Sequence, residues 1–554
     1  MVTRRTFLTT LMGSISAIAL SGCGQWRRFF QPEVSRTAID IHTHFFNGRD
    51  VPIVGFLQQT QLRDAHAAVD PQMRSDAFLK LLKAILLAKT PTAAEELAAL
   101  EKGRAPMSRD AVEAQDEAKV AEALERFSRS TGQATAGLRT SQFAEEAILD
   151  RIAAEVGATP TRKGLQTQRA QTTLLASRIY AKETNTEAKS LSRGQEREYV
   201  HRSSLMQTIR WAGLLTRSRL DILAELDRLY GQEGGIRIFS PSLVDFGAWF
   251  FTEESVTPIE DQIEVVARIT QVYEEALILP FAPFCPLRAA LEREDDPEID
   301  PLRNVKHAVL ERGFLGVKLY PPMGFRPVGN DSDLSWVPRK PVKGGAALDR
   351  ELDDLFGWCV ENEVAIKAHA TNSIAAGPDT GRFADPAGWQ VLMRDQRFTD
   401  LRLNLAHFGG FDETDTTRAF TSGGNWEETL VEMVEEFPNV YFDLGYWNEV
   451  TEGDAASQER VLTLTSDLLE RHPEMVNRMM YGSDWSMIGK EPSHPEYLAK
   501  VLGVLEQLSL TDTQIQRVMG GNAARYLGLD HSGPPRDRLQ KAYADHPVYQ
   551  SVFT

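Results

Sequence analysis

The stretch Ala38-Ile39-Asp40-Ile41-His42-Thr43-His44 is a short apolar run that ends in two histidines separated by one residue. Alternate side chains of a β-strand point to the same face. We therefore expect His42 and His44 to lie side by side at the end of a strand, where two imidazoles can hold one metal ion. A lone H-x-H pair is weak evidence, because two unrelated histidines at a strand end have the same spacing. The rest of the chain decides between these interpretations.

From Gly235 onward the chain alternates between strand-like and helix-like segments. Seven further apolar runs have the length and composition of strands; they are 236–239, 277–283, 315–319, 364–368, 401–406, 440–444 and 479–481. Helix-like stretches follow most of them: 258–276, 302–312, 348–361, 426–437, 457–471 and 494–508. With 38–41 as the first strand, the pattern predicts a (β/α)₈ TIM barrel formed by 37–50 and 232–530. An open doubly wound sheet is the alternative, but no G-x-G-x-x-G follows the early strands.

Residues 51–231 interrupt this alternation directly after the first strand. They are rich in Ala, Leu, Glu, Arg, Lys and Gln and contain no strand-like run. Helix-period apolar patterns predict an all-helical insertion, with helices over 78–89, 94–101, 118–127, 143–156 and 205–230. The insertion could cover a site, bind a partner or form a dimer contact. Residues 531–554 are expected to be a C-terminal tail.

Candidate functional side chains follow the predicted strands, where a barrel carries its catalytic groups. They are His42, His44, Lys318, His369, His407 and Asp484. Each has a plain alternative alone: a structural histidine, an exposed lysine or a helix-capping aspartate. Four of the eleven histidines lie at predicted strand ends. Together, these positions favour one shared site at the mouth of the barrel.

This ordered set resembles the amidohydrolase superfamily, and within it the amidohydrolase-related (family 2) branch of metal-dependent hydrolases. The resemblance covers 37–48 and roughly 235–529. It is carried by Asp40-Ile41-His42-Thr43-His44, Gly316-Val317-Lys318-Leu319-Tyr320-Pro321-Pro322, His369, His407, Gly482-Ser483-Asp484-Trp485 and Gly520-Gly521-Asn522-Ala523-Ala524-Arg525. The helical insertion and Ser486, where many relatives have Pro, depart from the pattern.

The resemblance implies a metal held by His42, His44 and Asp484. His369 would be a fourth ligand of a single ion, or part of a second-ion site with His407. Histidine nitrogen and carboxylate oxygen suit Zn²⁺, with Mn²⁺, Fe²⁺ or Co²⁺ as alternatives. Metal-activated water would attack an amide, cyclic amide or lactone. Asp484 would accept the proton of this water and pass it to the leaving group, while the metal or His407 would polarise the carbonyl.

Lys318 bears on whether the site holds one ion or two. A lysine beside a dication has a lowered pKa, and its neutral amine can form a carbamate that bridges two ions. In binuclear relatives the bridging lysine lies on the fourth strand, where Lys318 falls. Its Val-Lys-Leu-Tyr-Pro-Pro context is also common in the related branch, where one metal is usual and this lysine contacts substrate. We expect one metal ion.

Other residues near the predicted mouth could assist. Asp40 could orient an imidazole or be a purely structural carboxylate. Arg326, in the loop after the fourth strand, could bind a substrate carboxylate, although a surface arginine is the alternative. The pocket could be lined by tryptophans that follow strands, namely Trp249, Trp447 and Trp485.

Residues 1–23 have the pattern of an export signal: a basic start, a short apolar core and a small-residue cleavage site. Thr3-Arg4-Arg5-Thr6-Phe7-Leu8 resembles a twin-arginine signal, and Leu20-Ser21-Gly22-Cys23 resembles a lipobox, in which the cysteine is lipidated. We expect an exported lipoprotein on the periplasmic side, anchored to the cell envelope through Cys23, with 24–36 as a tether. An uncleaved N-terminal helix is the alternative.

Composition limits the partners. The formal net charge is −17, which argues against nucleic acid, because phosphate backbones require clustered Lys and Arg. We expect a small-molecule substrate, membrane attachment only through the lipidated cysteine, and leave a homo-oligomer open. Two functions compete with hydrolysis: non-oxidative decarboxylation or hydration at the same site, and a non-catalytic envelope lipoprotein with a degenerate barrel.

Overall fold

The computed structural model describes residues 37–52, 87, 90–106, 214–232, 234–250, 256–330, 334–373, 376–377, 379–411, 425–453, 455–491 and 493–553. The predicted signal with Cys23, the tether, and all or most of the predicted helices 78–89, 118–127 and 143–156 lie outside these residues. The described residues comprise most of the predicted barrel and, chiefly, the parts 90–106 and 214–231 of the predicted insertion.

The strands of the described residues all pair in parallel, in the orders β1-β2-β3 and β4-β5-β6-β7-β8-β9. Their bounds are β1 Ile39–Thr43, β2 Ile238–Pro241, β3 Leu277–Ile278, β4 Phe281–Pro283, β5 Gly316–Leu319, β6 Ala365–Thr371, β7 Leu403–Gly409, β8 Val440–Asp443 and β9 Met479–Met480. Each predicted strand is present, with bounds that differ by up to three residues.

The two groups of strands join into one ring. The predicted strand 277–283 contains both β3 and β4, and Pro280 lies at the break between them. Proline has no backbone N–H and so interrupts a ladder. At this break an isolated β-bridge between Ser242 and Phe281 joins the two groups of strands. A second isolated β-bridge, between Thr43 and Trp485, joins them on the other side of the ring. The parallel α/β barrel predicted from the sequence is confirmed at this level.

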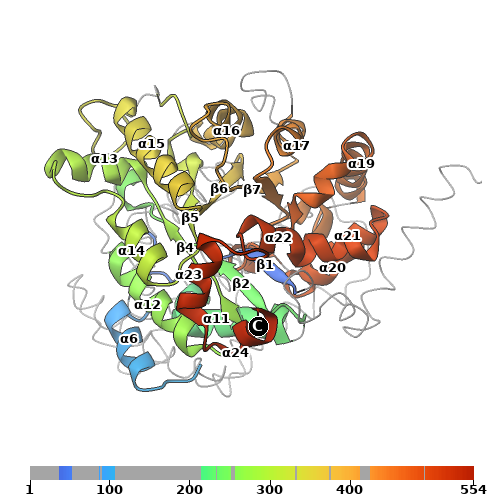
Figure 1. The fold of residues 1–554 in the computed structure, drawn as a ribbon, viewed down its shortest axis with the longest axis horizontal. Helices are drawn as coiled ribbons and strands as arrows, with labels where there is room; N and C mark the ends of the chain where they lie inside the picture. Colours follow the sequence, from blue (N-terminus) through green and yellow to red (C-terminus); the bar gives the residue numbers. More distant parts are fainter. Residues whose placement is uncertain are drawn as a thin grey trace, which may run out of the picture.

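Helices follow the strands and surround them (Figure 1). The α-helices are α6 Ala93–Glu101, α11 Arg219–Leu226, α12 Ile259–Val272, α13 Pro286–Asp295, α14 Arg303–Glu311, α15 Gly345–Glu361, α16 Pro386–Met393, α17 Trp426–Glu436, α18 Asn448–Thr451, α19 Ala455–Arg471, α20 Tyr497–Gln507, α21 Asp512–Gln516, α22 Asn522–Tyr526, α23 Pro534–Tyr543 and α24 Pro547–Phe553. Shorter or irregular turns are η4 Asp227–Gln232, η5 Gly247–Trp249, η6 Pro321–Met323, η7 Thr380–Ala384, η9 Pro473–Asn477, η10 Met487–Lys490, η11 His494–Glu496 and η12 Arg517–Gly521.

The segment 531–554, expected as a tail, contains helices α23 and α24. Their buried side chains, including Leu539 and Val552, join a core cluster with Ile39 and Ile238 from the first two strands. The hydroxyl of Tyr543 donates a hydrogen bond to the carbonyl of Gly313, which precedes β5, at 2.8 Å. These helices therefore close the N-terminal end of the barrel and leave the opposite end for the strand-end side chains.

Two described parts of the predicted insertion, 90–106 and 214–231, are tied to the loop after β1. The guanidinium of Arg219, at the start of α11, contacts Asp50 and Glu96, and the Arg219 Nε to Asp50 Oδ2 distance is 3.0 Å. All three side chains are buried. Helix α6 confirms the predicted helix 94–101, and α11 with η4 confirms the end of 205–230. No helix of the described residues is both long and apolar enough to cross a membrane.

Candidate metal centre

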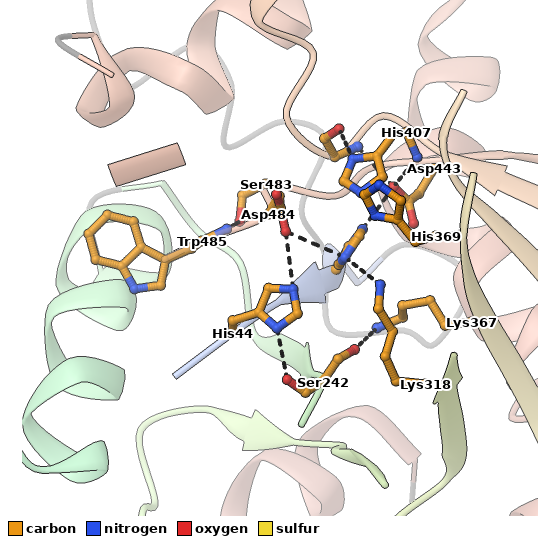
Figure 2. A network of polar contacts seen from close by, with 12 residues as sticks. His44, Ser242, Lys318, Lys367, His369, His407, Asp443, Ser483, Asp484 and Trp485 are labelled. Carbon is orange, nitrogen blue, oxygen red and sulfur yellow. Dashed lines mark hydrogen bonds and ion pairs between the residues drawn. The ribbon is translucent and has the colours of Figure 1, made fainter. Parts of the chain in front are cut away.

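His42, His44 and Asp484 converge at the C-terminal end of the barrel, and Figure 2 shows His44 and Asp484 facing each other. Asp484 Oδ1 lies 3.4 Å from His42 Nε2 and 3.2 Å from His44 Nε2. One ligand atom from each residue lies within 4.8 Å of the other two, and all three residues are buried. The structure thus brings together the three residues that the sequence assigned to a first metal.

The Nδ1 atoms of His42 and His44 are hydrogen-bonded to other parts of the protein. His42 Nδ1 lies 3.2 Å from Asp443 Oδ1, and His44 Nδ1 lies 2.8 Å from the carbonyl oxygen of Ser242. A carbonyl and a carboxylate can only accept, so both Nδ1 atoms carry the proton and both Nε2 atoms present a lone pair. Burial lowers the pKa of His42 and of His44, which favours the neutral, ligating form.

Asp484 is positioned by contacts between its loop and β1. Its backbone N–H donates to the carbonyl of His42 at 2.7 Å, and its φ of +57° lies in the left-handed region. Such a conformation in a non-glycine residue costs roughly 1–3 kcal/mol and occurs often at functional sites. Burial alone would raise the pKa of Asp484, but His42, His44 and His407 lower it below its usual value.

Asp40 contacts backbone rather than an imidazole ring. Its Oδ1 accepts hydrogen bonds from the N–H groups of His42, at 3.2 Å, and Ser483, at 3.0 Å. Burial raises the pKa of Asp40 to about 7. The geometry therefore supports the structural role: Asp40 ties the strand that carries the histidine pair to the loop that carries Asp484.

His369 and His407 form a second pair, joined by a distance of 2.9 Å between His369 Nδ1 and His407 Nε2. His407 Nδ1 lies 2.8 Å from the carbonyl oxygen of Gly445, so this atom carries a proton and Nε2 accepts when the ring is neutral. His369 Nε2 lies 2.6 Å from Ser373 Oγ. The ring centroids of His407 and His42 are 4.8 Å apart, which places the pair beside the first cluster.

Lys318 also reaches the cluster. Its Nζ lies 3.0 Å from His42 Nε2, and the residue is 2% exposed. Burial lowers the pKa of Lys318 to about 8, against the opposing effect of the carboxylates of Asp484 and Asp443. The fourth predicted strand therefore delivers an amine to the metal ligands themselves, as the resemblance implied.

A hollow with an empty volume of about 240 Å³, part of it open to solvent, adjoins Lys318. Half of its lining residues are aromatic, and these include Phe246, Trp249, Tyr320 and Phe325. The predicted pocket residue Trp249 is thus part of this lining. Neither Trp447 nor Trp485 is, and Trp485 points away from the cluster (Figure 2).

Arg326 does not line this hollow either. Its guanidinium lies 4.5 Å from the centre of the Phe383 ring, and its backbone N–H donates to Asn330 Oδ1 at 2.7 Å. The structure therefore does not bring Arg326 together with the metal-ligand cluster, and a contact with substrate stays a prediction.

The sequence reasoning missed Asp443, Ser242 and Lys367. Asp443 ends an apolar strand, which is the same signal that identified His42 and His369, and it could have been found in this way. Ser242 acts through a backbone carbonyl, which no residue type reveals. Lys367 lies within a buried strand, two residues before His369, and resembles any lysine at a strand edge in the sequence.

The donor set fits a divalent transition metal. Two neutral imidazole nitrogens and one carboxylate oxygen are ligands that Zn²⁺ prefers. A carboxylate or a carbonyl on the far nitrogen of a ligating histidine is the usual arrangement around such ions. A second group, His42, His407 and Asp443, also meets the spacing of a metal site. It shares His42 with the first, and Asp443 is already engaged by four protein N–H donors.

Residues 260–529 match the amidohydrolase family Amidohydro_2. An uncharacterised TIM-barrel protein of Bordetella bronchiseptica is 14% identical, with a TM-score of 0.35 over 56% of this chain and 83% of that one. An amidohydrolase of Burkholderia multivorans with bound zinc is 16% identical, with a TM-score of 0.36 over 58% of this chain and 92% of that one. None of the curated proteins matches the chain at a significant level.

Proposed function

We propose that this chain, whose residues 260–529 match the amidohydrolase family Amidohydro_2, uses one divalent metal, most simply Zn²⁺, to hydrolyse a C–N or C–O bond of an amide, cyclic amide or lactone. One observation carries the proposal: the Nε2 atoms of His42 and His44 converge on Asp484 Oδ1 while both Nδ1 atoms are bonded elsewhere. When bound there, such a metal supplies a Lewis acid that acidifies water and polarises a carbonyl.

Asp484 is the proton carrier in this proposal. Its carboxylate has two acceptor oxygens, and an ionised carboxylate can accept a proton from the attacking water. Its Oδ1 lies between the two ligating histidines, which places the accepted proton close to the reacting centre. The proton then passes to the leaving nitrogen or oxygen, so the carboxylate is regenerated.

His407 has a role that depends on its protonation. In the neutral ring, Nδ1 donates to Gly445 and Nε2 holds a lone pair. It could then ligate or accept a proton, and it could donate to a substrate carbonyl only after gaining a second proton. Carbonyl polarisation by His407 therefore requires an imidazolium, whereas a metal can polarise the carbonyl at any protonation state of this residue.

Lys318 enters the proposal as a contact with the substrate. Its Nζ lies 3.0 Å from His42 Nε2. We propose that this amine contacts the polar group of the substrate beside a single metal ion. A carbamate on Lys318 that bridges two ions is the alternative, and mass spectrometry of the intact protein would detect the added mass.

A substrate screen tests the reaction class. The metal-loaded protein is incubated with amides, cyclic amides, lactones and unsaturated or aromatic acids, and ring opening and CO₂ release are measured separately. We expect hydrolysis without CO₂ release, and a loss of at least about 100-fold in kcat for Asp484→Asn, in the range found for general acid–base groups. The exposed Asp353→Asn is the matched control and should retain full activity. CO₂ release without hydrolysis would contradict the proposal.

Export and anchoring remain proposals that rest on the sequence of residues 1–23. We propose that the protein leaves the cytoplasm through a twin-arginine signal and is lipidated at Cys23. Cell fractionation should find the wild type with the membranes of the cell envelope and Cys23→Ser in another fraction. Equal membrane association of both proteins would contradict lipidation at this residue.

A further inference from the structure

Lys367 is a fully buried amine in the interior of the barrel that the proposed reaction does not use. It lies on β6 and is 0% exposed. Its Cα is in register with that of Lys318 on the neighbouring strand β5. Side chains in register on adjacent strands point to the same face, so two lysines lie next to each other at one level of the barrel interior.

The amino group of Lys367 reaches towards β2. Its Nζ donates to the carbonyl of Ser240 at 3.0 Å and to Ser242 Oγ at 3.0 Å. It also lies 4.1 Å from the centre of the Phe281 ring, on β4. Two oxygen acceptors and one aromatic face therefore surround the amine, and they hold it against the end of β2.

Ser242 connects this amine to the metal ligands. Its hydroxyl accepts from Lys367, while its backbone carbonyl accepts from His44 Nδ1 at 2.8 Å. The chain of contacts Lys367–Ser242–His44 is visible in Figure 2. Lys318, by contrast, contacts His42 directly. Each of the two adjacent lysines thus reaches one of the two histidines, Lys318 by contact and Lys367 through Ser242.

We propose that Lys367 is a positioning residue of the metal centre. It fixes the end of β2 so that the Ser242 carbonyl keeps the proton of His44 on Nδ1 and directs His44 Nε2 towards Asp484. The inference rests on the proposed metal site at His42, His44 and Asp484. Partners of this kind raise metal affinity or activity by about 10- to 100-fold in other metalloproteins.

The competing explanation is that Lys367 only holds β6 and β2 together. The two explanations differ in what a substitution changes. Lys367→Met removes the donor of the Ser240 carbonyl and of the Ser242 hydroxyl, so a lower melting temperature is expected under both explanations. A purely structural lysine would change thermal stability and leave metal affinity as it was, whereas a positioning lysine changes metal affinity of a protein that still folds.

The test measures the zinc dissociation constant by competition with a chromogenic chelator, together with the melting temperature of the metal-free protein. The variants are Lys367→Met and Ser242→Ala, and the control is the exposed Lys306→Met. Ser242→Ala removes the hydroxyl that Lys367 binds but keeps the carbonyl that His44 binds. We expect Lys367→Met to weaken zinc binding by about 10- to 100-fold, Ser242→Ala to weaken it to a smaller extent, and the control to match the wild type.

The possible outcomes separate this inference from the proposed function. Wild-type zinc affinity in a folded Lys367→Met would overturn the positioning role and leave the metal site intact. If Lys367→Met does not fold, Ser242→Ala decides: weakened zinc binding with an unchanged melting temperature supports the role, and unchanged binding overturns it. A wild type that binds no zinc would overturn the metal site and this inference together.

Discussion

Asp443 illustrates how single residues set the chemistry of this site. It lies at the end of β8, is 0% exposed, and accepts hydrogen bonds from His42 Nδ1, Asn404 Nδ2 and the backbone N–H groups of His407 and Gly445. One carboxylate thereby orients a metal-ligating histidine and holds the backbone of a second histidine. His42 and these hydrogen bonds offset the effect of burial and lower the pKa of Asp443 well below its usual value.

The substitution Asp443→Asn tests this role. The amide keeps the shape but loses the charge that strengthens the hydrogen bond to His42. We expect the zinc dissociation constant to rise by about 10- to 100-fold, measured by chelator competition. Asp353→Asn removes an exposed carboxylate of the same size and should leave the zinc dissociation constant unchanged. Equal zinc affinity of Asp443→Asn and the wild type would contradict the role.

The two described cysteines should be inert in the folded protein. Cys285 and Cys359 are buried and free, and burial raises the pKa of the Cys285 thiol to about 12 and that of Cys359 further above its usual value. Alkylation needs the thiolate. In a Cys23→Ser background, mass spectrometry should detect no modification by iodoacetamide at mildly alkaline pH, and two modifications in guanidinium chloride. Rapid labelling of the native protein would contradict the burial described here.

At the residue scale, the candidate ligands His42, His44 and Asp484 could be identified by type and place, because each stands at the end of an apolar strand. Their assignment to one metal ion came from the family resemblance. The tautomers could not be identified in this way, because they depend on Asp443 and on the carbonyl of Ser242, which come from other strands. Only the closed barrel brings these partners together.

At the scale of elements, the strands were predictable and several helices were not. Helices α13 and α16 are short and begin with Pro286 and Pro386. Proline is favourable at the first position of a helix but was not recognised as a start signal there. The break in the third predicted strand at Pro280 likewise becomes visible only from the pairing of β3 with β2 and of β4 with β5. Local patterns predicted where elements lie, and pairing decided where they end.

Helix α23 provides a stability test at this scale. Leu539 is 0% exposed and packs in the cluster that closes the N-terminal end of the barrel. Leu539→Ala should lower the free energy of unfolding by about 2–5 kcal/mol, because it leaves a cavity. The exposed neighbour substitution Gln540→Ala should change it by less than about 0.5 kcal/mol. Chemical denaturation measures both, and equal effects would contradict the packing of α23 on the barrel.

At the scale of the whole molecule, two described parts of the predicted insertion meet the loop after β1 in one buried ionic cluster. Arg219 binds two carboxylates, Asp50 and Glu96, so the cluster carries excess negative charge when both are ionised. Burial raises the pKa of Glu96 to about 7, against the opposing effect of Arg219. Composition predicts an insertion here but could not predict this cluster, whose residues lie far apart in the chain.

This cluster predicts how stability depends on pH. Burial raises the folded-state pKa of Glu96 from its usual value of 4.5 to about 7. The contribution of protonated Glu96 to the free energy of unfolding is therefore fully present below pH 4.5 and is lost as the pH rises through 7. The free energy of unfolding falls over this range by at most about 1.4 kcal/mol per pH unit. Denaturation of Glu96→Gln should show less decline over this range than the wild type. Parallel pH profiles would contradict the raised pKa.

The metal content of the purified protein tests the central claim most directly. Elemental analysis is made on the wild type and on His42→Ala/His44→Ala after loading with zinc and removal of the excess. The account predicts one equivalent of zinc per chain in the wild type and none in the double variant, with both proteins folded by circular dichroism. A folded wild type without metal, two equivalents per chain, or an unchanged content in the double variant would contradict it.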